Sequence, residues 1–112
     1  MLQFKGVVEK EIGGKIVLFK FNMATLTMFG DLQNASLAEV GAELANPRIS
    51  TLVNFLYAGT KVYDRQEKPS KLQNYSQDDA AEWIEKLGFD EGLSLMNEAF
   101  DAPEIKNGQA PK

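Results

Sequence analysis

The chain has 112 residues, which is enough for one domain and too few for two domains with separate cores. It contains no cysteine and no histidine, so disulfides, thiolate nucleophiles and the commonest general base are excluded. The net charge is −4 and the Lys and Arg residues are scattered, so no cluster of positive charge indicates nucleic-acid binding. No apolar run is long enough to span a bilayer. We therefore expect a soluble, cytoplasmic protein without a cofactor.

The N-terminal residues predict a β-hairpin. Two runs of alternating polar and apolar residues flank Gly13-Gly14, and primed two-residue turns need positive φ at both positions. A turn there pairs Glu11 with Ile16 and sets the register of the whole hairpin. One face is expected to join the core and carries Leu2, Phe4, Val8, Val17, Phe19 and Phe21. The other face mixes charged residues with three apolar ones, Val7, Ile16 and Leu18.

Two helices are expected after the hairpin. Asn22 is a plausible N-cap for a short helix over Met23–Phe29 that ends at Gly30. Ser36 begins a capping-box spacing that opens a second helix to about Ala45. The second helix is expected to bury Leu37, Val40 and Leu44.

The longest helix is predicted over about Pro47–Asp64, with Asn46-Pro47 as its cap and first helical residue. Its apolar face is wide, so we expect it to be the central helix, packed on several sides. The main stripe consists of Ile49, Leu52, Val53, Leu56 and Tyr63. Phe55, Tyr57 and Val62 lie off this stripe and predict an apolar groove, which is either open to a partner or covered by the chain's own helices.

The last part of the chain predicts two shorter helices after a loop at Arg65–Tyr75. Ser76 caps a helix that ends at Gly88, and its expected buried stripe is Ala80, Trp83, Ile84 and Leu87. A final helix over about Glu91–Phe100 offers Leu93, Met96 and Phe100 to the core. The predicted fold is α+β: an N-terminal hairpin packed on four or five helices, as one domain over residues 1–100, with a flexible, disordered tail at 101–112.

No group of residues predicts catalysis or metal binding. The densest acidic cluster consists of Asp78, Asp79, Glu82 and Glu85. Helical spacing spreads these carboxylates around an outer face, which is typical of a capped and solvated helix start. A small enzyme that uses only carboxylates is an alternative, and it would require such side chains to converge in a pocket.

The order of these signals is more specific than any one of them. A hairpin ending in GGKIVLFKFN runs into a short helix, MATLTMFG, and is followed by SLAEVGAEL and by a helix with LVNFLYAGTKV. A capped helix with Trp83 then ends at LGF and leads to a last short helix. Over about Gly13–Phe100 this order resembles the tail assembly chaperones of long-tailed bacteriophages and gene transfer agents. The resemblance implies a non-enzymatic protein of the host cytoplasm that binds the tape measure protein and keeps it soluble until tail tube subunits polymerise around it.

The resemblance supplies no binding residues, so the candidate interface rests on the side chains themselves. The two expected surfaces are the outer hairpin face, with Val7, Ile16 and Leu18, and the groove formed by Phe55, Tyr57 and Val62. The expected partner is the tape measure protein, with tail tube protein and a second copy of the chain as further candidates. An alternative function is that of a self-assembling phage structural or regulatory protein of the head–tail or tail-completion type. The sequence leaves open whether Ile16 and Leu18 are covered by the chain's own helices or by a partner.

Overall fold

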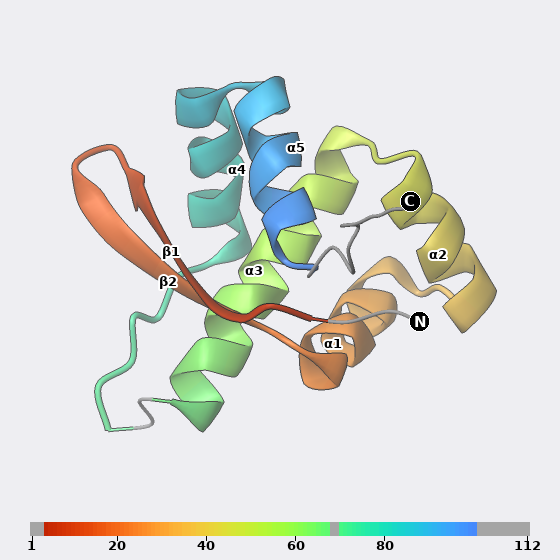
Figure 1. Ribbon diagram of the computed structural model, residues 1–112, viewed down its shortest axis with the longest axis horizontal. Helices are drawn as coiled ribbons and strands as arrows, with labels where there is room; N and C mark the ends of the chain where they lie inside the picture. Colours follow the sequence, from red (N-terminus) through yellow and green to blue (C-terminus); the bar gives the residue numbers. More distant parts are fainter. Residues whose placement is uncertain (1–3, 68–69, 101–112) are drawn as a thin grey trace, which may run out of the picture.

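The computed structural model describes residues 4–67 and 70–100, which form a two-stranded hairpin followed by five helices (Figure 1). The elements are β1 (Gly6–Ile12), β2 (Lys15–Phe21), α1 (Met23–Gln33), α2 (Leu37–Ala45), α3 (Ile49–Gln66), α4 (Gln77–Leu87) and α5 (Phe89–Glu98). The predicted α+β fold, a hairpin packed on four or five helices, is confirmed. Leu2 and the tail expected to be disordered, 101–112, lie outside the described residues.

The hairpin has the predicted register. Gly13 and Gly14 form the turn with φ values of 60° and 83°, a conformation that residues with a Cβ adopt rarely. Glu11 lies opposite Ile16, and the antiparallel pairing continues to the far end of both strands. The inner face is buried in the core and carries Val8, Ile12, Val17, Phe19 and Phe21, of which Ile12 was not assigned to this face from the sequence.

The central position predicted for the long helix is confirmed. α3 packs against β2, α1, α4 and α5, and it crosses the middle of the molecule in Figure 1. The Phe55 ring stacks on Phe21 at 5.3 Å between centroids and meets Phe29 edge-on at 5.5 Å. This aromatic cluster joins the hairpin to α1 through α3, because aromatic pairs in these geometries add to the gain from burial.

The end of α1 differs from the prediction. The helix does not stop at Gly30 but continues to Gln33, and Asn34 ends it in a left-handed conformation with φ of 53°. Gly30 is buried inside the helix, where a Cβ would lie 3.4 Å from Val40 Cγ2. The glycine therefore serves the packing of α2 against α1, whereas an asparagine, which tolerates positive φ, closes the helix.

The start of α3 also differs from the prediction. Asn46-Pro47 precedes the helix, and Arg48 is the N-cap, with its backbone N–H donating to Thr51 Oγ1 at 3.1 Å. Ile49 is the first residue of the helix, is 61% exposed and does not belong to the buried stripe. At its other end α3 runs two residues past Asp64, to Gln66.

The last two helices lie close to their predicted positions. Ser76 caps α4 in a capping box with Asp79, and Ala80, Trp83 and Ile84 are buried as expected. α5 spans Phe89–Glu98, so it begins before Glu91, and it buries Leu95 as well as Met96. The end of the described chain lies beside the residues that precede the hairpin. The Lys5 N–H donates to the Ala99 carbonyl at 2.8 Å, and Phe4 forms an antiparallel bridge with Phe100.

Candidate binding surfaces

The outer face of the hairpin is the first candidate surface. Val7 is exposed, Ile16 is 55% exposed and Leu18 is half-buried, and all three lie on the face that the register requires. No described helix buries Val7 or Ile16, so the cover over this face is incomplete. Their role as partner-binding residues stays a prediction.

The connector between α3 and α4 covers the edge of β2 near Leu18. Gln73 Oε1 accepts a hydrogen bond from the Leu18 N–H at 2.9 Å, and Gln73 Nε2 donates to the Leu18 carbonyl at 2.8 Å. A carboxamide carries a donor and an acceptor side by side, so it replaces the peptide group that a third strand would offer. One side chain therefore caps the centre of this strand edge.

A buried carboxylate holds the connector in place. Asp64 of α3 accepts hydrogen bonds from the backbone N–H groups of Gln73 at 3.1 Å and Asn74 at 3.0 Å, and from Gln73 Nε2 at 3.2 Å. Asn74 has a positive φ of 60°, a backbone conformation that asparagine tolerates better than most residues. Asp64, Gln73 and Leu18 thus form one network, which the reading of Arg65–Tyr75 as a plain loop missed. An acidic residue among the apolar positions of α3 is the only sequence signal for it.

A hollow of about 360 Å³ opens between the outer hairpin face and the connector. We call it the hairpin groove, and its lining consists of Ile16, Leu18, Tyr63, Lys71, Leu72, Gln73 and Tyr75. Leu72, which the sequence did not single out, is 57% exposed. The connector therefore adds exposed apolar surface beside the outer hairpin face and does not cover that face completely.

The groove expected beside the long helix is covered by the chain's own side chains, which is the second of the two alternatives that the sequence left open. Phe55 is completely buried and Val62 nearly so, while Tyr57 is partly buried with the Lys61 ammonium 5.5 Å from its ring centroid. Phe55 faces the hairpin and α1, so the space that was expected to accept a partner is filled by the chain's own aromatic side chains.

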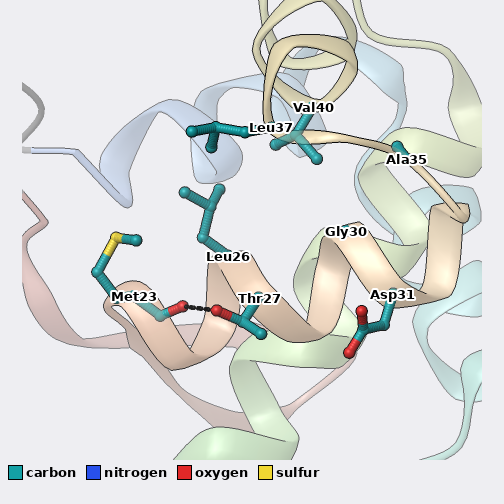
Figure 2. A pocket seen from close by; sticks show the side chains of 8 residues that line it. All are labelled: Met23, Leu26, Thr27, Gly30, Asp31, Ala35, Leu37 and Val40. Carbon is teal, nitrogen blue, oxygen red and sulfur yellow. Dashed lines mark hydrogen bonds between the residues drawn. The ribbon is translucent and has the colours of Figure 1, made fainter.

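A second surface lies between α1, α2 and α5. Two adjoining hollows, of about 210 and 320 Å³, share Leu26, Leu37 and Val40. Figure 2 shows Leu26 of α1 pointing toward Leu37 and Val40 of α2. We call this surface the helix groove, with a lining that includes Met23, Leu26, Leu37, Val40, Leu44, Met96 and Phe100.

The expectation that the second helix buries Leu37 is wrong. Leu37 is instead 76% exposed, and Met23 at the start of α1 is 59% exposed. Both residues are the first residue of a helix, so no preceding helical turn packs beside their side chains. An apolar residue directly after an N-cap is the signal that could have indicated an exposed position.

Two acidic side chains, Glu39 and Asp79, form hydrogen bonds in helix caps. The pKa of Glu39 lies below its usual value because the Ser36 backbone N–H, 2.7 Å away, and the Ser36 hydroxyl stabilise its carboxylate. At the start of α4, the Asp79 carboxylate accepts hydrogen bonds from the Ser76 backbone N–H at 2.8 Å and from the Ser76 hydroxyl at 3.1 Å. Within residues 4–67 and 70–100, no three carboxylates come close enough together to hold a metal ion.

None of the helices in the described part of the chain combines the length and apolar character needed to cross a bilayer. Comparison with known proteins adds no relative: no family model, no curated protein and no solved structure matches the chain. The two apolar surfaces and the order of elements along the chain are the features of the molecule that bear on its function.

Proposed function

We propose that this protein is a phage tail assembly chaperone, which binds the tape measure protein in the host cytoplasm and keeps it soluble for tail tube polymerisation. It acts by binding, without chemistry. The observation that carries the proposal is the hairpin groove, where Ile16 and Leu72 keep more than half of their side-chain surface exposed. The order of elements, a hairpin followed by five helices with a long one in the middle, supports the same class of protein.

The hairpin groove has the physical properties that a chaperone of a helical client needs. Burying apolar surface gains about 25 cal/mol for each Å² removed from water. Ile16, Leu72 and the ring of Tyr75 line a concave surface that could accept the apolar stripe of a helix, with Lys71 at its rim. The binding is expected to be reversible, since the client must be released when the tube assembles.

The test is co-expression with a tape measure protein and measurement of the soluble yield of that client. Wild-type protein is expected to raise the yield, and the double variant Ile16→Asp with Leu72→Asp is expected to lose most of the effect. Both side chains are largely exposed, so the charges are tolerated by the fold. Ile49→Asp is the matched control, because Ile49 is equally exposed and lines neither groove.

A wild-type protein that leaves the client insoluble would reject the chaperone function. A folded double variant that still solubilises the client would show that another surface binds it. Self-association of the wild type, measured by sedimentation and abolished in the double variant, would favour the self-assembling structural protein instead. Tail tube protein can be tested in the same co-expression assay.

A further inference from the structure

We propose that the free edge of β1 binds an extended peptide strand that carries Lys or Arg at alternate positions. In the described part of the chain the sheet has two strands, so each strand has one edge outside the hairpin (Figure 1). Gln73 bonds the edge of β2 at Leu18. We call the opposite side of the sheet, where β1 faces away from β2, the β1 edge. Over Val7–Glu11 no hydrogen bond from another described segment reaches the backbone of this edge.

The hairpin register identifies the backbone groups at the β1 edge. In an antiparallel pair, residues alternate between those that direct their N–H and C=O at the partner strand and those that direct them away. Both backbone groups of Leu18 point away from β1, because they bond Gln73. Glu9 lies opposite Leu18, so its N–H and C=O point away from β2. The same holds two residues to either side, at Val7 and Glu11, and the three residues together offer donors and acceptors to an added strand.

The backbone just before β1 is already paired. The Lys5 N–H donates to the Ala99 carbonyl at 2.8 Å, and Phe4 forms its antiparallel bridge with Phe100. An added strand can therefore extend from the hairpin turn to Val7, and the residues that follow α5 limit it beyond that point.

Two carboxylates at the β1 edge lack a cationic partner. Glu9 and Glu11 are exposed on the outer face of the hairpin, and neither forms an ion pair with a described residue. The lysines of the two strands do not neutralise them: Lys10 and Lys20 pair with other carboxylates, and Lys15 lies next to the turn on the other face. An added strand would place one side chain directly beside each carboxylate, because residues opposite each other in a sheet are close neighbours.

The spacing along β1 defines the sequence of the partner. Residues opposite Glu11, Glu9 and Val7 are two apart in the added strand, so they share one face. Lys or Arg at the first two positions would pair with the carboxylates, since opposite charges across a sheet attract. An apolar residue at the third would contact Val7, which is 46% exposed. An antiparallel partner read from its N-terminus therefore has the pattern Lys-x-Lys-x-Val.

A second copy of the chain is a poorer occupant of the β1 edge. Two β1 strands related by a two-fold axis pair antiparallel, and the residue on the axis lies opposite itself. Registers centred on Glu9 or Lys10 place carboxylates of the two copies opposite each other, which is destabilising. Registers centred on Val8 or Val7 bring Lys5 into the ladder, but its N–H is already bonded.

The experiment uses fluorescent seven-residue peptides with the full-length protein. One has the sequence Thr-Lys-Thr-Lys-Thr-Val-Thr, and the other has Glu in place of both Lys. Fluorescence anisotropy is expected to show at least about tenfold tighter binding of the Lys peptide, which corresponds to about 1.4 kcal/mol. This preference should shrink as salt screens the charges.

Variants of the protein separate the β1 edge from a general attraction of cations to an acidic chain. Glu9→Gln with Glu11→Gln is expected to remove most of the preference for the Lys peptide. Glu82→Gln with Glu85→Gln is the matched control, because it makes the same change of net charge at exposed positions of α4. All four side chains are exposed, so both double variants are expected to fold.

Backbone methylation of the peptide tests strand pairing itself. The N–H of the second Lys, opposite Glu9, would donate to β1, whereas the N–H of the Thr before it would point away. Methylation of that Lys nitrogen is expected to abolish binding, and methylation of the Thr nitrogen is expected to preserve it. NMR hydrogen exchange should show new protection of the Val7, Glu9 and Glu11 amides when the Lys peptide binds.

Three results would overturn the proposal. Equal binding of the two methylated peptides would reject strand addition. Equal binding of the Lys and Glu peptides, or a full preference in the Glu9→Gln with Glu11→Gln variant, would reject the charge assignment. Protection of the same amides by dimerisation, without binding of either peptide, would make a second copy the occupant.

This inference does not depend on the proposed function. The peptides contain no phage sequence, so a failure to bind them rejects the strand site and leaves the chaperone assay to be decided separately. Conversely, the co-expression assay varies Ile16 and Leu72, neither of which belongs to β1.

Discussion

Gly59 shows how one atom controls the approach of two elements. It lies on α3 where the helix meets the inner face of the hairpin, and a Cβ there would be 2.8 Å from Phe21 Cε1 and 3.3 Å from Phe19 Cδ2. Both rings are completely buried, so neither can swing into solvent to make room. The close contact between α3 and β2 therefore requires a residue without a side chain.

Gly59→Ala is expected to lower the free energy of unfolding by about 1–3 kcal/mol, because the added methyl group overpacks the core. The measurement is urea denaturation followed by circular dichroism. Gly41→Ala is the control: that glycine lies in α2 with open space around it, so alanine should stabilise the protein by up to about 1 kcal/mol through helix propensity. Equal stability of Gly59→Ala and wild type would contradict the packing of α3 on β2.

The cap at the start of α2 predicts a pH dependence. Because Glu39 has a lowered pKa in the folded state, its ionised form stabilises the fold above the unfolded-state pKa, and that contribution is lost as pH falls through the folded-state pKa. Wild type should therefore lose stability relative to Glu39→Gln between neutral and acid pH. NMR titration of the Glu39 carboxyl gives its pKa directly. A stability difference that stays constant with pH would mean that the bond to Ser36 does not form in solution.

At the scale of elements, the connector after α3 acts as a substitute third strand. Its described residues form no backbone ladder with β2, yet Gln73 satisfies both outward-facing backbone groups of Leu18, and Asp64 positions Gln73. An uncovered strand edge can pair with a strand of another chain. Because Gln73 occupies the β2 edge at Leu18, less of that edge is available for such pairing.

Gln73→Ala is expected to cost about 1–3 kcal/mol, since it leaves the backbone groups of Leu18 without partners in a half-buried position. The specific effect should be faster amide hydrogen exchange at Leu18, measured by NMR. Leu72→Ala, one residue away and exposed, should leave the Leu18 amide protected. Unchanged exchange at Leu18 in Gln73→Ala would show that the connector does not cap the strand.

At the scale of the whole molecule, Phe55 joins segments that are far apart in the sequence. Its ring contacts Phe21 of β2, Phe29 of α1 and, at 6.0 Å between centroids, Phe100 at the end of the described chain. The same residue had been expected at a binding groove. Its position explains why the hairpin, the central helix and the C-terminal end form one core.

Phe55→Ala is expected to lower the free energy of unfolding by about 3–5 kcal/mol, a large share of the roughly 5–15 kcal/mol that stabilises a typical domain. Denaturant titration measures the change. Phe89→Ala is the control, because the same substitution at the partly exposed start of α5 removes far less buried surface. Similar losses for the two variants would contradict the central role of Phe55.

The sequence by itself determined the local features of this protein. Gly13-Gly14 established the hairpin and its register, and the capping box at Ser36 and the N-cap at Ser76 located two helix starts. These features depend on backbone geometry and hydrogen bonds within a few residues, so the residue types alone contain the information.

Only the tertiary structure decided which apolar residues are buried. α3 has apolar side chains on several sides, and its periodicity could not show that Phe55 faces the hairpin while Ile49 faces solvent. The helix groove and the link from Gln73 to Leu18 likewise join residues from separate elements. Such contacts depend on how helices and strands far apart in the chain pack together, which no local pattern specifies.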